Sequence, residues 1–125
     1  MIVGIGVDIC SVERLARLRQ RYGRRFLDRV FTAAEQAYCG GGSNCDQRYA
    51  ARFAAKEAFL KALGTGFASG ITLKDVEIAS APSGRPALVV TGQAKQMGQQ
   101  LGVQTTHVSL SHERDHAIAF VVLER

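Results

Sequence analysis

The sequence predicts an α+β fold, a single compact domain with helices packed on a mainly antiparallel sheet, and three observations support this prediction. The chain has 125 residues, which suits one domain that buries about two-thirds of its unfolded surface without disulfides. Helical and strand-like patterns alternate along it. Near the C-terminus, two strand-like runs flank a short turn and predict an antiparallel hairpin. We therefore expect residues 1–125 to form one domain.

The composition excludes two classes of protein. A hydrophobic content of 46% is too high for a disordered chain, and no apolar run approaches the roughly 20 residues needed to cross a membrane. Met1 leads directly into a strand-like run rather than a signal peptide, so we expect a cytoplasmic location. The spacing of Cys10, Cys39 and Cys45 matches no zinc motif, and in that compartment we expect free, reduced thiols.

The first predicted strand runs from Ile2 to Ile9. Its odd positions are apolar, whereas Gly4, Gly6 and Asp8 share the opposite face. Glycine weakens a strand, and it often marks a place where another backbone or a ligand approaches closely. Asp8 stands near the strand end, where a carboxylate either serves a functional site or caps the following helix. The position alone favours neither interpretation.

The first predicted helix, Val12 to Tyr22, is capped by Ser11 and ends near Gly23. Its expected inward face consists of Val12, Leu15, Ala16, Leu18 and Tyr22. Arginines recur on the outward face at spacings of three and four; we call Arg14, Arg17, Arg21 and Arg24 the arginine stripe. Because like charges at this spacing repel and the net charge is +5, the stripe predicts an acidic macromolecular partner as readily as a role in solubility alone.

Two further helices are predicted in the middle of the chain. A capping box at Thr32–Glu35 opens a short helix that ends near Cys39. After a run of three glycines, a long helix extends from about Cys45 to Leu63, capped by Ser43 or Asn44.

The long helix contains the stretch RFAAKEAFLKALGTG, residues 52–66, in which Glu57 and Lys61 lie among small residues on one helical face. One interpretation is an i,i+4 ion pair that contributes roughly 0.3 kcal/mol on a solvated helix. The other is that charges on a mostly apolar helix need a partner, which a ligand or a metal ion could supply.

The remaining elements are shorter. The loop Gly64–Gly70 offers backbone amides to a phosphate, although so short a glycine motif is weak support. Two strands, Val76–Ala79 and Ala87–Val90, flank a tight turn that carries Arg85, and a polar helix follows over Gln93–Leu101.

The hairpin at the end of the chain pairs Thr105–Glu113 with His116–Leu123. Ser111 and His112 lie near its turn. A lone histidine in such a position is more often structural or exposed than catalytic, so the hairpin by itself predicts no active site.

Three separated blocks of this chain resemble the stand-alone holo-acyl-carrier-protein synthases, which are small 4′-phosphopantetheinyl transferases. The blocks are GIGVDICSVERL at 4–15, RFAAKEAFLKALGTG at 52–66 and SLSHERDHAIAFVV at 109–122. Their order, their spacing and the total length also agree with this family. The resemblance implies the phosphopantetheinyl transferase fold. It further implies magnesium-dependent transfer of the phosphopantetheine arm of coenzyme A to a serine of apo acyl carrier protein, with release of adenosine 3′,5′-bisphosphate.

The resemblance also implies roles for individual residues. Asp8 and Glu57 would bind magnesium, and Glu57, Lys61 and His112 would take part in catalysis. Coenzyme A would be bound by Lys61, Gly64, Gly66, Arg85, Ser111 and His112, with Lys61 at the diphosphate and Arg85 at the 3′-phosphate. The general base stays open among Glu57, a metal-bound water and a nearby carboxylate.

The resemblance implies two kinds of protein partner. The arginine stripe would hold the acidic carrier protein. The chain itself would form a homotrimer in which each active site is shared between neighbouring subunits. No membrane and no nucleic acid is expected as a partner.

Two other functions are compatible with parts of the sequence. A non-catalytic basic module would bind RNA or another polyanion through the arginine stripe, but aromatic residues for base stacking are not interleaved with these arginines. A small metal-dependent hydrolase would release phosphate products from coenzyme A without a carrier protein.

Overall fold

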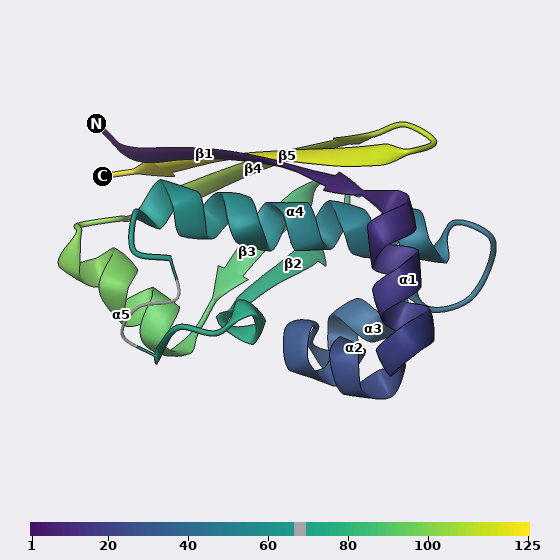
Figure 1. The fold of residues 1–125 in the computed structure, drawn as a ribbon. Coiled ribbons are helices and arrows are strands. Elements are labelled where there is room, and N and C mark those ends of the chain that lie inside the picture. The colour runs from purple at the N-terminus through teal and green to yellow at the C-terminus, as the bar shows by residue number, and fades with distance from the viewer. Residues whose placement is uncertain (67–69) are drawn as a thin grey trace.

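Helix α4, Cys45–Leu63, runs through the centre of the molecule (Figure 1). The computed structural model describes residues 1–66 and 70–125. A three-stranded sheet covers one side of α4, and the other elements lie mostly on its opposite side. The observed architecture is the α+β arrangement that the sequence predicts.

The larger sheet is antiparallel, with strand order β1-β5-β4. Its strands are β1 (Ile2–Ser11), β4 (Thr105–His112) and β5 (His116–Glu124). The predicted hairpin is therefore confirmed, and β1 joins it from the other end of the chain. A second, two-stranded antiparallel sheet consists of β2 (Val76–Ser80) and β3 (Pro86–Val90).

The smaller helices are α1 (Val12–Tyr22), α2 (Arg24–Val30), α3 (Ala33–Cys39), the short 3-10 helix η2 (Leu73–Asp75) and α5 (Gly92–Gln100). The predicted bounds of α1 and α4 match the structure, and those of α5 differ by one residue at each end. Helix α2 is not predicted by the sequence pattern. Its seven residues are too few to display a helical period clearly.

The helix caps follow the local sequence in most cases. Ser11 Oγ accepts a hydrogen bond from the amide of Arg14 at 3.2 Å, so Ser11 rather than Asp8 caps α1. Thr32 and Glu35 form the predicted capping box of α3. Asn44 occupies the N-cap position of α4, but its side chain makes no capping hydrogen bond.

The glycines of β1 allow its backbone to touch the backbone of α4. A Cβ atom added to Gly4 would lie 1.9 Å from the carbonyl oxygen of Ala62, and one added to Gly6 would lie 1.9 Å from that of Ala58. The close approach expected of these glycines is therefore confirmed, and the approaching group is the helix backbone. This contact turns the side chains of Ile5, Val7 and Ile9 away from the core.

These side chains form an exposed surface on the far side of the sheet. We call Ile5, Val7, Ile9, Ile118 and Phe120 the outer apolar face; their exposed fractions range from 41% to 63%. Ile9 pairs with Ile118 and Val7 pairs with Phe120 across the two strands, so the face is continuous.

Two further expectations concern burial. Tyr22 was expected on the inward face of α1, but it is 48% exposed because it lies in the last turn of the helix, next to the exposed start of α2.

Cys10, Cys39 and Cys45 are free thiols, as expected. Among the residues described, no helix combines the length and the apolar character that a membrane span requires.

Candidate functional site

Lys61 reaches from α4 across to β1 instead of pairing along its own helix. Its Nζ donates to Asp8 Oδ1 at 2.9 Å and to the carbonyl oxygen of Val7 at 3.1 Å. The Lys61 side chain is 55% exposed, and that of Asp8 is 17% exposed. The predicted i,i+4 ion pair between Glu57 and Lys61 is therefore wrong, because Lys61 pairs with Asp8.

Glu57 lies one helical turn before Lys61 and is half-buried. Partial burial raises the pKa of the Glu57 carboxyl above its ordinary value, and the negative charge of Asp8 raises it further. Lys61 and Arg14 act in the opposite direction. The two carboxylates are thus close enough to repel each other, and a cation placed between them would relieve that repulsion.

Arg14 contributes to the same cluster, which the sequence did not reveal. Its guanidinium lies 5.8 Å from the ring centroid of Phe53, and Phe53 precedes Glu57 on α4 by four residues, about one turn. The arginine stripe therefore begins at the carboxylates. A sequence pattern within α1 carries no information about which part of another helix lies beside it.

The other members of the arginine stripe, Arg17, Arg21 and Arg24, are exposed. Arg19 lies between them in the sequence but forms a bidentate ion pair with Asp46, at 2.7 and 3.1 Å, that ties α1 to the start of α4.

A hollow of about 340 Å³ lies where α1 meets α2, and it is lined by Leu18, Tyr22, Arg25, Phe26 and Arg29. The hollow therefore combines apolar and aromatic side chains with two arginines.

The two glycines after α4 differ: Gly64 caps the helix, and Gly66 is exposed in the loop that follows. Gly64 has φ +81° and caps the helix, with its amide donating to the carbonyl oxygen of Leu60 at 3.0 Å, so that amide is not free for a phosphate. Gly66 is exposed with φ +59°. A Cβ at either glycine would meet only open space. The predicted loop 64–70 also contains residues 67–69, which lie outside the described residues.

Ser111 and His112 do not join this cluster within one chain. Ser111 pairs with Ile118, which pairs with Ile9, so the Ser111 side chain belongs to the outer side of the sheet. Asp8 precedes Ile9 on β1, so its side chain lies on the opposite side of the sheet and faces α4. A hollow of about 190 Å³ at the hairpin includes Ile9, Ser111 and His112 among its lining residues.

Arg85 is exposed in the turn between β2 and β3. Within residues 1–66 and 70–125, no hydrogen bond or ion pair links Arg85, Ser111 or His112 to Asp8, Glu57 or Lys61.

A second charged pair on α4 is completely buried. Lys56 Nζ contacts Glu35 Oε1 at 2.7 Å and donates to the carbonyl oxygens of Leu73 and Val76 at 2.9 and 2.7 Å. Burial lowers the pKa of Lys56, and the charge of Glu35 opposes that change. Glu35 Oε2 also accepts from the amide of Ile78 at 3.0 Å. Lys56 therefore joins α4 to α3, η2 and β2.

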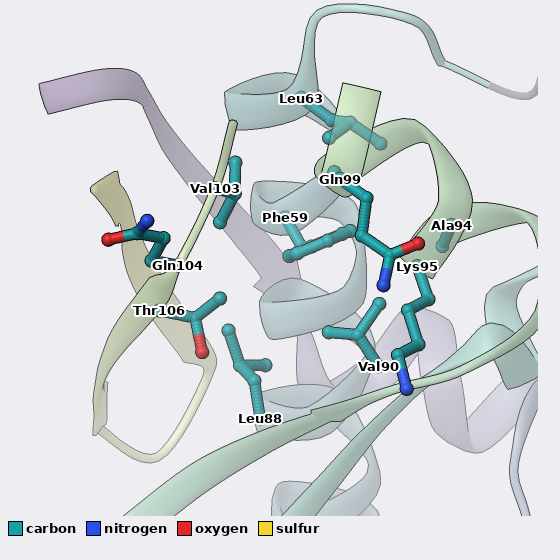
Figure 2. Close-up of a pocket in the computed structure, with 11 residues that line it drawn as sticks. Phe59, Leu63, Leu88, Val90, Ala94, Lys95, Gln99, Val103, Gln104 and Thr106 are labelled. Atoms are coloured by element: carbon teal, nitrogen blue, oxygen red, sulfur yellow. The ribbon is translucent and has the colours of Figure 1, made fainter. Parts of the chain in front are cut away.

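A cavity of about 250 Å³ lies behind α4, between β3, β4 and α5 (Figure 2). Phe59 and Leu63 line it from α4, and Lys95 and Gln99 contribute polar groups from α5. Lys61 lies two residues from each of these α4 side chains and thus points to the other side of the helix. The cavity is therefore separate from the cluster of Asp8, Glu57 and Lys61.

Comparison with known proteins gives a consistent result. A family model described as the 4′-phosphopantetheinyl transferase superfamily matches residues 4–121. The holo-[acyl-carrier-protein] synthase of Koribacter versatilis is 49% identical over 124 residues, covering 99% of each chain. That of Geobacter metallireducens is 46% identical over 125 residues, covering 100% of this chain and 99% of the relative.

Solved structures of similar proteins share the fold. The holo-[acyl-carrier-protein] synthase of Neisseria meningitidis superimposes with a TM-score of 0.89 at 36% identity, over 100% of both chains. The Helicobacter pylori enzyme, solved in complex with coenzyme A, gives a TM-score of 0.84 at 30% identity, covering 96% of this chain and 99% of that one.

Proposed function

The chain belongs to the 4′-phosphopantetheinyl transferase superfamily, and on that premise we propose that it acts as a holo-acyl-carrier-protein synthase in the cytoplasm. It transfers the 4′-phosphopantetheine arm of coenzyme A to a serine hydroxyl of an apo acyl carrier protein and releases adenosine 3′,5′-bisphosphate. The observation that carries this proposal is the cluster of Asp8, Glu57 and Lys61, which stands at the edge of a basic surface in a chain related to these enzymes over its full length.

The reaction requires charge neutralisation more than a covalent nucleophile. The serine oxygen attacks the pantetheine-side phosphorus, the bond from that phosphorus to the bridging oxygen breaks, and negative charge develops on the departing phosphate. Lys61 suits this charge because its ammonium is exposed and held in place by Asp8 and the Val7 carbonyl.

We infer that Asp8 and Glu57 hold the magnesium ion. Magnesium prefers oxygen ligands and is usually bound through one or two carboxylates plus waters and substrate phosphates. Two half-buried carboxylates, one of which raises the proton affinity of the other, fit that preference. A bound magnesium ion would neutralise the diphosphate. In the part of the chain that the structure describes, no cluster of three or more acidic, histidine or cysteine side chains competes for the metal.

The acidic carrier protein is expected to dock on the arginine stripe. Arg14 lies beside the carboxylates, so a carrier bound there presents its serine near Glu57. The apolar hollow between Leu18, Tyr22 and Phe26 offers a place for a carrier side chain, and Arg25 and Arg29 border it.

We also propose that the protein is a homotrimer with shared active sites. The outer apolar face is larger than the isolated apolar residues usually found on a monomer surface, so a neighbouring subunit would cover it. Ser111 belongs to this side of the sheet, whereas Asp8 faces α4. A neighbour that covers the outer face would bring its own cluster toward Ser111, one of the residues assigned to coenzyme A.

A mass-shift assay tests the reaction, the metal and the partner together. Purified protein is incubated with coenzyme A and apo carrier protein, with magnesium or with a chelator, and the carrier is weighed by mass spectrometry. We expect the phosphopantetheine mass increase only with magnesium. An unchanged carrier mass in magnesium would refute the proposed reaction, and consumption of coenzyme A without carrier would indicate a hydrolase.

A further inference from the structure

The cavity of about 250 Å³ between α4, α5, β3 and β4 has no role in the proposed transfer reaction (Figure 2). We call it the α5 cavity. It is lined from the side of α4 that carries Phe59 and Leu63, whereas Lys61 points to the other side of that helix. A ligand in the α5 cavity would therefore lie across α4 from the residues assigned to transfer.

The interior of the α5 cavity is apolar. Phe59 and Leu63 are only 2% and 4% exposed and belong to the hydrophobic core. Leu88 and Val90 line the cavity from β3, and Val103 lines it from the segment before β4. An apolar cavity of about 150 Å³ in another protein stays dry and binds benzene. The larger α5 cavity therefore favours an apolar guest over water.

Two polar side chains of α5 stand beside this apolar space. Lys95 and Gln99 are exposed and lie one helical turn apart, so they share a face of α5. Figure 2 shows both on the same side of the cavity, whereas Gln104 points away from it. An ammonium and an amide can each donate a hydrogen bond to an oxygen of one carboxylate.

The charge beside the cavity is positive and has no counter-ion among the residues described. None of the described residues that line it is acidic, and Lys95 forms no ion pair with them. Lys95 is also the only charged residue of α5. Asp75 contacts the start of α5, but its Oδ2 accepts from the Ala94 amide at 3.3 Å and its Oδ1 from the Thr72 hydroxyl at 3.0 Å. This carboxylate therefore caps the helix and does not line the cavity.

An apolar interior beside a single cation matches a molecule with a hydrocarbon body and one anionic group. We propose that the α5 cavity binds an alkyl carboxylate, with its chain against Phe59 and Val90 and its carboxylate at Lys95 and Gln99. A nucleotide phosphate would match the ammonium but not the apolar lining, and an uncharged hydrocarbon would match only the lining. This binding site goes beyond the proposed transfer reaction and does not depend on it.

NMR titration of the isotope-labelled protein tests this site, with octanoate as the carboxylate and octanol as the uncharged ligand of equal chain length. Octanoate should cause saturable shifts of backbone amides in α5 and β3. Val90→Phe places a larger side chain in the cavity and should weaken the binding of both ligands about tenfold.

A second variant tests recognition of the carboxylate. Lys95→Met removes the charge and keeps an unbranched side chain, so the affinity for octanoate relative to octanol should fall about three- to tenfold. Lys74→Met, at an exposed lysine on η2 outside the cavity, is the matched control. Its affinity ratio should stay within about twofold of wild type.

The two parts of the proposal can fail separately. Absence of saturable shifts in α5 and β3, or octanoate binding that is unchanged in folded Val90→Phe, would refute the cavity as a binding site. If Lys95→Met weakens both ligands equally or neither, carboxylate recognition is refuted. Thermal melting checks that each variant is folded, and the exposed position of Lys95 keeps the test decisive if Val90→Phe does not fold. Because no carrier protein or coenzyme A is present, the result is independent of the proposed function.

Discussion

Helix α4 carries two lysines five residues apart whose surroundings are opposite. Lys56 is fully buried against a fully buried Glu35, and its ammonium also donates hydrogen bonds to two backbone carbonyl oxygens. Lys61 is more than half exposed and pairs with Asp8 at the open edge between β1 and α4. Both ion pairs have short contacts, so the contact length does not distinguish them.

The two ion pairs differ in whether water, salt or a ligand can take the place of one partner. A buried pair has no access to water, so removing one partner leaves an uncompensated charge in a medium of low dielectric constant. An exposed pair is weak, because water and salt compete for both groups. Lys56 is therefore suited to hold the elements of the fold together. Lys61 is suited to exchange Asp8 for a phosphate oxygen.

The largest expected effect comes from breaking the buried pair. Lys56→Met should destabilise the protein by about 3–5 kcal/mol, because Glu35 would stay buried without its cation. Urea denaturation measures this change. The double variant Lys56→Met with Glu35→Leu should recover part of the loss, since both charges are then gone. A single variant as stable as wild type would contradict a structural role for this pair.

The next effect is on catalysis. Glu57→Gln should lower the transfer rate by about 10²–10³, the usual consequence of losing one charged or polar group that stabilises a transition state. Its stability should stay close to wild type, because Glu57 is half-buried and makes no ion pair within the described residues. The carrier mass-shift assay and a urea titration measure these two quantities. Normal turnover of the variant would remove Glu57 from the site.

A smaller effect should come from separating β1 from α4. Gly6→Ala would place a Cβ 1.9 Å from the Ala58 carbonyl oxygen, so the strand must move away from the helix. We expect about 1–3 kcal/mol of destabilisation, together with reduced transfer as Asp8 moves relative to Lys61. Gly98→Ala is the control, because its nearest neighbour would be the Val103 Cβ at 3.8 Å, an ordinary contact. Equal stability of both variants would contradict the close packing of β1.

The smallest effect is a pH dependence of the metal-free protein. Burial and the charge of Asp8 raise the pKa of Glu57, so the folded state binds this proton more tightly than the unfolded chain. The resulting stability is fully present below the ordinary pKa of 4.5 and is lost as pH rises through the raised value. Stability curves from pH 4 upward should therefore differ in slope between wild type and Glu57→Gln. The total difference should stay below about 1 kcal/mol, because solvent screens a half-buried carboxyl. Parallel curves would exclude a raised pKa.

The sequence predicts which residues belong to the candidate site, but it predicts only part of how they are arranged in space. The strand with Asp8, the helix with Glu57 and Lys61, and the capping residues Ser11 and Thr32 all follow from local patterns. The partner of Lys61 did not, because α4 offered Glu57 at the favourable spacing whereas β1 supplied Asp8 from 53 residues away.

The sequence by itself determined most elements of this protein, the arginine stripe and the resemblance to a known family, because caps, periodicity and motifs are properties of neighbouring residues. Only the tertiary structure decided which side of each element is buried. It turned the apolar side of β1 outward, since glycines at positions 4 and 6 let the helix backbone pack on the other side. It also decided that Lys56 is buried and Lys61 is exposed, because other elements pack on α4 around Lys56 but not around Lys61.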